Sequence, residues 1–180
     1  IFDTPLQWVV MLAPLAFVLV LSFGINKLSA QTAQILYWAF AATMGASLSI
    51  IFLTYTPTSI VRVFFISAAT FGAMSLYGYT TQRNLMSWGS FLFMGLIGII
   101  IAMIVNIFLA SAALDFAISA IGVLVFVGLT AYDTQRIRNE YAATDGTEVA
   151  TKKAVFGALR LYLDFINLMM MMLRLFGVRR

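Results

Sequence analysis

The sequence contains no cysteine and no histidine among its 180 residues, and only 10% of its residues are charged. Without cysteine, the chain has no disulfide, no thiolate metal site and no cysteine nucleophile. Without histidine, it lacks the only side chain whose unperturbed pKa lies between pH 5 and 8. Any response to pH near neutrality must therefore come from carboxylates in unusual surroundings.

Sequence motifs of common enzymes are also missing. There is no glycine-rich phosphate loop, no Ser-His-Asp set and no zinc motif, so we expect neither a cofactor nor a catalytic site of these kinds. The net charge of +4 arises from 11 basic and 7 acidic residues. Most of them lie in short links between apolar stretches, which is typical of membrane topology rather than of nucleic-acid binding.

The dominant feature is hydrophobicity, because 62% of the residues are hydrophobic and the mean hydropathy is +0.98. These values lie far outside the range of soluble domains and predict an integral membrane protein in a lipid bilayer. A membrane helix needs about 20 mainly apolar residues. The stretches that qualify are 6–24, 34–54, 60–79, 89–109, 115–135 and 154–176. The sequence therefore predicts an all-α polytopic bundle with six membrane helices, forming one domain over residues 1–180.

The orientation follows from the basic residues in the links. Lys27, Arg83 and the basic residues of a predicted loop at 136–153 mark the cytoplasmic side, whereas the intervening links contain no lysine or arginine. This alternation is consistent for five spans. The sixth, 154–176, has basic residues at both ends, so the charges leave open whether it crosses the membrane or re-enters it.

An aspartate interrupts this last apolar stretch. Asp164 lies within ALRLYLDFINL (158–168), with Arg160 four residues before it and Asn167 three residues after it. A carboxylate near the centre of a membrane helix costs about 2.5 to 3.5 kcal/mol on insertion scales, so such residues usually face a protein interior and have a partner. Two interpretations remain: a polar functional site, or a buried ion pair with Arg160 that only fixes helix packing.

A second aspartate, Asp133, ends the fifth stretch on the side from which the sixth begins. The two carboxylates are therefore candidates to meet. At about 4 Å and an effective dielectric of about 20 they would repel by about 4 kcal/mol, so the pair would hold one proton near neutral pH. Such a latch would join the two helices when protonated, and would bind a cation or let the helices part when deprotonated. The alternative is that Asp133 faces water and pairs with Arg136. For Arg62, near the start of 60–79, we expect snorkelling to the interface rather than an acidic partner across the bundle.

Three strings carry a resemblance to a known family. They are SLYGYTTQRNL (75–85), GLTAYDTQRIR (128–138) and ALRLYLDFINLMMMMLRLFG (158–177), and they are similar to strings of the Bax-inhibitor family, the transmembrane BAX-inhibitor-motif proteins. The resemblance implies a bundle of seven helices with the last one central, and a pH-sensitive calcium leak. The family's aspartate pair corresponds to Asp133 and Asp164, which are also the candidate calcium ligands. Because the chain opens on Ile1 with six spans, we expect the family's first helix to precede it.

The resemblance is closest to bacterial members, which implies an inner membrane, or the endoplasmic reticulum for a eukaryotic chain. One departure is that 6–24 contains no acidic residue or arginine, which some bacterial relatives place there, so the polar network around the latch is expected to be smaller. A second functional hypothesis is a regulatory protein that modulates a membrane protease or a stress or cell-death response without transport. A diaspartyl intramembrane protease is disfavoured, because Tyr162 and Leu163 stand where such enzymes have Gly-x-Gly before the second aspartate, so we expect no enzyme.

Overall fold

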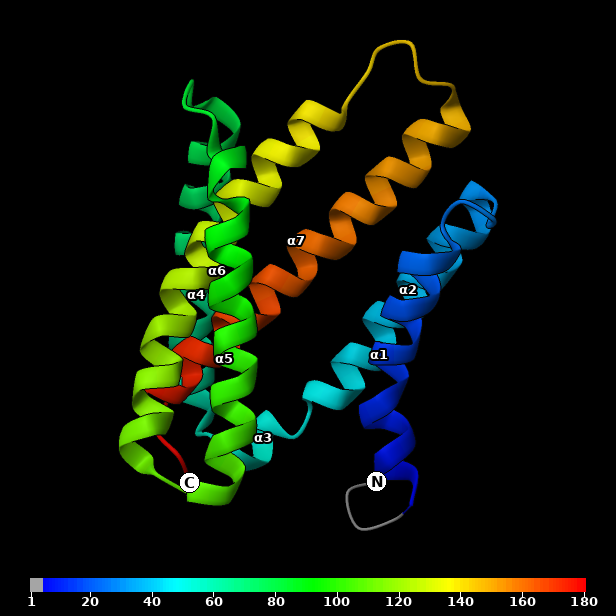
Figure 1. Cartoon of the computed structure of the whole chain (residues 1–180). Coiled ribbons are helices and arrows are strands. Elements are labelled where there is room, and N and C mark those ends of the chain that lie inside the picture. Colours follow the sequence, from blue (N-terminus) through cyan, green and yellow to red (C-terminus); the bar gives the residue numbers. More distant parts are fainter. Residues whose placement is uncertain (1–4) are drawn as a thin grey trace. The chain divides into compact units, whose positions relative to one another are not determined.

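The computed structural model describes residues 5–180, except for the side chain of Gln7. The regular elements of this part are helices (Figure 1). They are α1 (Leu6–Gly24), α2 (Ala30–Leu48), α3 (Ile51–Thr54), α4 (Pro57–Thr80), the 3₁₀ helix η1 (Leu85–Trp88), α5 (Gly89–Leu109), α6 (Ala112–Glu140) and α7 (Thr147–Phe176). Among the described residues, the only β-type pairing is an isolated antiparallel bridge between Tyr55 and Arg179. The predicted all-α polytopic class is confirmed.

Each of the six predicted apolar stretches forms helix. Five helical stretches are long and apolar enough to cross a membrane: Ala30–Thr54, Pro57–Thr80, Leu85–Leu109, Ala112–Glu140 and Thr147–Phe176. The first stretch forms a shorter apolar helix, described as Trp8–Gly24 by the same criteria.

Several predicted boundaries were wrong, for local reasons. The second helix begins at Ala30 rather than near residue 34, because the Ser29 hydroxyl caps it by accepting a hydrogen bond from the Thr32 N–H at 3.2 Å. The predicted loop at 136–153 was also wrong. Helix α6 continues to Glu140 and α7 begins at Thr147, so only residues 141–146 link them.

The chain divides into two compact units, Ile1–Thr54 with Glu140–Arg160, and Tyr55–Asn139 with Leu161–Arg180. In the first unit α1 packs against α2, and Leu21, Ala33 and Phe40 are fully buried. The second unit contains α4, η1, α5, nearly all of α6 and the C-terminal half of α7. Both candidate aspartates belong to this second unit. That the whole chain is one domain stays a prediction.

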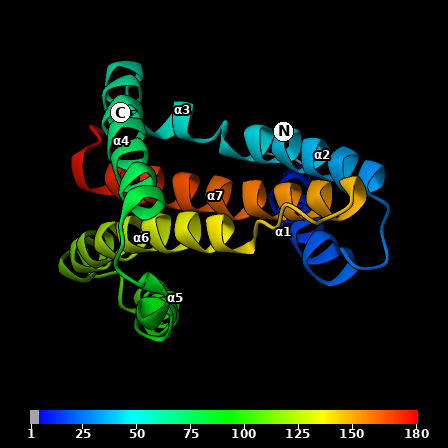
Figure 2. The same cartoon turned by 90° about the horizontal axis from the view of Figure 1, so that it is seen from above.

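In the second unit, the C-terminal half of α7 packs against both α4 and α6. The Ser67 hydroxyl of α4 contacts the Met172 sulfur at 3.2 Å. On the other side, a Cβ at Gly122 of α6 would lie 2.9 Å from the Met171 sulfur. Figure 2 shows the red C-terminal end of α7 beside α4. Among the candidate spans α7 also has the largest buried share, 44% against 11 to 28%; that it is the central helix of the bundle stays a prediction.

Helix α7 extends to the end of the second unit opposite the α4–α5 link. The Arg174 guanidinium lies 3.6 Å from the Asp115 carboxylate in the first turn of α6, and the Val178 N–H donates to the Ser59 hydroxyl near the start of α4 at 2.9 Å. At about 1.5 Å per residue, the 30 residues of this uninterrupted helix extend about 45 Å, more than the roughly 30 Å of a bilayer core. This geometry favours a crossing over a re-entrant loop.

Candidate functional site

Asp164 is buried in α7, with 6% of its surface exposed. The ring of Phe165 next to it meets Phe64 and Phe71 of α4 edge to face, with centroids 5.9 and 5.4 Å apart. Such edge-to-face pairs are a favourable arrangement of aromatic rings, and they set the rotation of α7 against α4. The aspartate is thereby held within the protein rather than against lipid.

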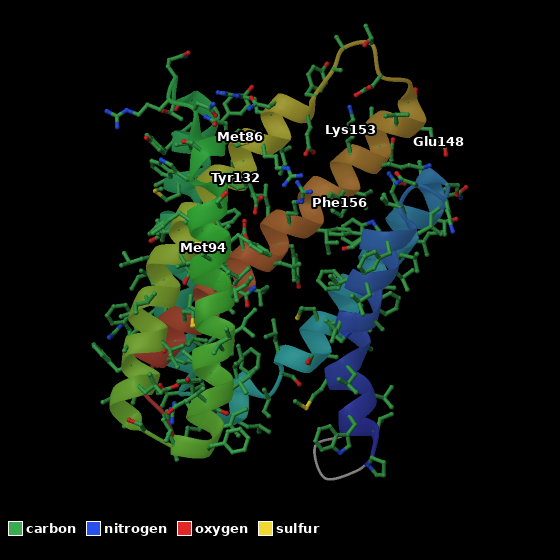
Figure 3. The ribbon with its side chains drawn as sticks, viewed as in Figure 1. Met86, Met94, Tyr132, Glu148, Lys153 and Phe156 are labelled. Atoms are coloured by element: carbon green, nitrogen blue, oxygen red, sulfur yellow. The ribbon has the colours of Figure 1, made fainter. Side chains whose placement is uncertain are left out.

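Asp133 is half-buried in α6 and lines a cavity of about 460 Å³. The cavity lies between the start of α5 and the last turns of α6, and Figure 3 shows Met86 and Tyr132 at this end of the unit. The other lining residues are Gly89, Ser90, Phe93, Leu129 and Arg136. Asp133 therefore shares a polar-edged cavity with a hydroxyl, a phenol and a guanidinium, which suits a small hydrated ion.

The end of α6 that carries Asp133 is held in place by Gln135. Its side-chain oxygen accepts a hydrogen bond from the Leu85 N–H at 2.7 Å, and its nitrogen donates to the Arg83 carbonyl at 2.8 Å. Arg138, one turn further, donates to the Tyr79 carbonyl. These contacts tie the α4–α5 link to the end of α6. Arg83 and Arg138, both predicted to be cytoplasmic, therefore lie at the same end of this unit.

Two glycines allow the close approach of helices around this end. A Cβ at Gly78 would lie 2.3 Å from the carbonyl oxygen of Ala131, and a Cβ at Gly89 would lie 2.8 Å from the phenol oxygen of Tyr132. Real Cβ atoms essentially never approach other atoms so closely. The close packing of α6 against α4, which also positions Asp133, thus requires a residue without a side chain at Gly78.

The contact between Gly122 of α6 and Met171 of α7 gives a common reference point. From it, the positions of Asp133 and Asp164 along the two helix axes can be compared. Arg174 of α7 contacts Asp115 of α6, and Met171 lies against Gly122, so the two helices run in opposite directions. From the contact, Asp133 is about 16 Å along α6 and Asp164 about 10 Å along α7, toward the same end. The two carboxylates are therefore expected within about one helical turn of the same level.

The structure gives the following contacts for the supporting residues predicted from the sequence. Arg160 forms an ion pair with Glu140 at 3.5 Å and stacks over the Phe156 ring, 4.3 Å from its centroid. Asn167 donates to the Leu163 carbonyl of its own helix at 2.9 Å. Arg62 is exposed near the start of α4, and its snorkelling to the interface stays a prediction. Arg136 lies beside Asp133 in the cavity wall.

The residues described by the structure contain no group of three or more His, Cys, Asp or Glu side chains placed to hold a metal ion. Calcium takes six to eight oxygen ligands. A site built on Asp133 and Asp164 would leave most of this coordination to water and carbonyl groups.

Long apolar helices, a buried carboxylate in the last of them and a polar cavity at one helix end together define a polytopic α-helical membrane protein. The family model described as "Inhibitor of apoptosis-promoting Bax1" matches residues 1–180. The chain belongs to this Bax inhibitor family, as its three strings indicated.

Relatives in several bacteria support this assignment. The protein RP147 of Rickettsia prowazekii is 51% identical over 179 residues, which cover 99% of this chain and 76% of the relative. The inner membrane protein YbhL of Escherichia coli K12 is 53% identical over 171 residues, covering 94% of this chain and 73% of the relative. A membrane protein of Streptococcus pyogenes, SpyM3_0260, is 40% identical over 154 residues, covering 86% and 67%. The predicted inner-membrane localisation is confirmed.

Proposed function

We propose that this protein is a pH-sensitive calcium leak channel in which Asp133 and Asp164 form the gating pair. The observation that carries the proposal is the burial of Asp164 within an apolar helix, with Asp133 in the same compact unit. An ionisable residue in a membrane helix is expensive, and such residues commonly mark ion pathways. Membership of the Bax inhibitor family supports the same conclusion.

The proton carried by the pair controls the gate. When one proton is shared, a charge-assisted hydrogen bond holds α6 to α7. When that proton leaves, two carboxylates about 4 Å apart repel by about 4 kcal/mol at an effective dielectric of about 20. The helices then separate, and the pair attracts a divalent cation. Calcium flux therefore rises as the pH increases through the titration of the pair.

The cavity beside Asp133 supplies a route to the gate. It has a volume of about 460 Å³, which is ample for an ion with part of its hydration shell. Ser90 and Tyr132 offer oxygen atoms along its wall, and oxygen is the ligand that calcium prefers. An ion entering from the end of the unit that carries Arg83 meets Asp133 first and Asp164 next.

The test is calcium flux into proteoliposomes that contain the full chain, measured between pH 6 and 8. We expect a flux that rises with pH in the wild type and becomes independent of pH in Asp164→Asn. The matched control is Glu148→Gln, which removes a carboxylate that is 63% exposed in the first turn of α7 and should leave the flux unchanged.

Two results would contradict the proposal: no flux in the wild type, or the same pH profile in Asp133→Asn and Asp164→Asn as in the wild type. In that event, a stoichiometric membrane protease recovered with the protein from native membranes, with normal function in both variants, would support the regulatory role instead.

A further inference from the structure

Two arginines from the C-terminal part of the chain gather on one carboxylate at the other end of the second unit. Asp115, in the first turn of α6, lies 3.6 Å from the Arg174 guanidinium and 4.0 Å from that of Arg179. Both separations are longer than the 2.7 to 2.9 Å of a strong charge-assisted hydrogen bond. The Asp115 carboxylate therefore forms no strong hydrogen bond with either guanidinium group, and few of their N–H donors are used.

A cavity of about 340 Å³ opens at this cluster. Its wall is formed by Met103, Asn106 and Ile107 of α5, Asp115 and Ile118 of α6, and Arg174 of α7. Arg174 is 33% exposed, and besides Asp115 its guanidinium has a weak contact with the Met103 sulfur at 4.0 Å. A guanidinium presents five N–H donors in a planar fork, so most of the donors of Arg174 remain available to a group in the cavity.

The charge of this end favours an anion. Arg174 and Arg179 both face one carboxylate, Asp115, which leaves a local excess of one positive charge. The first turn of α6 adds to this, because the N-terminal end of a helix carries a partial positive charge. Oxyanions with several acceptor oxygens match such an arrangement, since phosphate accepts parallel hydrogen bonds from arginine.

The surroundings of the cavity place it at the boundary between lipid chains and headgroups. Ile107, Phe108 and Leu109 at the end of α5 are 75, 83 and 63% exposed, and Phe116 at the start of α6 is 65% exposed. Exposed apolar side chains on a membrane helix contact lipid chains, and the basic cluster lies where these helices end. A molecule with an anionic head and apolar chains can meet both surfaces at once.

We propose that the cavity lined by Arg174, Asp115 and Asn106 binds a phosphate group, in the first place the headgroup of an anionic phospholipid. Arg174 provides the bidentate contact and Arg179 the second positive charge. Asp115 orients Arg174 and limits the net charge of the empty site. The site lies at the opposite end of α6 from Asp133, so it can be tested separately from the calcium gate.

The experiment is native mass spectrometry of the full chain in a neutral detergent, titrated with phosphatidylglycerol. Diacylglycerol serves as a probe with similar chains and no phosphate, and inorganic phosphate serves as the soluble source of the same group. The variant is Arg174→Gln. The control is Arg62→Gln, which removes an exposed arginine near the start of α4 that the cavity does not include.

We expect phosphatidylglycerol to bind with one saturable site, and Arg174→Gln to weaken it by about tenfold or more, while Arg62→Gln has no such effect. Competition by millimolar inorganic phosphate that also depends on Arg174 would support a phosphate site open to the soluble ion. The proposal is overturned if diacylglycerol binds as well as phosphatidylglycerol, or if Arg174→Gln and Arg62→Gln bind the lipid equally.

Discussion

Gln135 of α6 and Leu85 of the α4–α5 link are joined by a hydrogen bond of 2.7 Å from the Leu85 N–H to the Gln135 side-chain oxygen. Leu85 is fully buried and Gln135 is 2% exposed, so water cannot replace the bond. Gln135 lies two residues after Asp133, on the same helical turn. The contact therefore positions one member of the proposed gating pair as well as the link.

Replacing Gln135 with Leu should destabilise the protein, because the Leu85 N–H and the Arg83 carbonyl lose their partner. A buried polar group left unsatisfied costs about 1 to 3 kcal/mol. The change in free energy of unfolding can be measured by denaturant titration in detergent. Gln82→Leu, at an exposed position in the same link, is the control and should change stability by less than about 0.5 kcal/mol. Equal effects of both substitutions would contradict this role for Gln135.

Gly78→Ala should destabilise the protein, because the new methyl group would meet the Ala131 carbonyl oxygen at 2.3 Å and backbone cannot move aside cheaply. Overpacking of this kind costs about 1 to 3 kcal/mol. Gly72→Ala in the same helix has no atom within 4 Å of the new Cβ, so it should stabilise the helix by up to about 1 kcal/mol. Thermal unfolding of the two variants should shift in opposite directions. Shifts of the same sign and size would show that the α4–α6 contact is not as close as described.

Lys153→Met should loosen the link between α6 and α7. The Lys153 ammonium donates to the Glu140 carbonyl at 2.9 Å and to the Asp145 carboxylate at 2.6 Å, so it closes the 141–146 link. For a partly exposed ion pair we expect a cost of about 1 kcal/mol or less, seen as faster hydrogen exchange of the amides in that link. The neighbouring Lys152→Met breaks only a contact with exposed Glu148 within the helix. Its exchange in the link should match the wild type, and equal acceleration in both variants would contradict the assignment.

The apolar stretches predicted the helices well but predicted poorly where they end. Hydropathy shows which segments are apolar enough to be buried away from water. It correctly predicted helix at α5 and in the apolar parts of α6 and α7. It does not show that a charged segment continues as helix when its side chains find partners. Arg138 donates to the Tyr79 carbonyl, which helps α6 to continue beyond residue 135. The loop was predicted at 136–153, whereas in the structure it comprises only residues 141–146.

The candidate site was predicted in part. A carboxylate in an apolar run identified Asp164, and helix order identified Asp133. Gln135 was not singled out, although a glutamine at the end of an apolar helix is a signal of a buried hydrogen bond. Asp115 was also not singled out, because its arginine partners follow it by about 60 residues in the sequence and are brought to it only by α7. Contacts of this kind depend on how α6 and α7 pack, and hydropathy contains no information on that packing.

The most direct test of the central claim is a double-variant cycle on calcium flux against pH, with wild type, Asp133→Asn, Asp164→Asn and the double variant in proteoliposomes. If the two carboxylates share one proton, each single variant should abolish the pH dependence between pH 6 and 8, and the double variant should match the singles, because interacting residues are non-additive. Independent, additive effects, or a pH profile that persists in either single variant, would contradict the account.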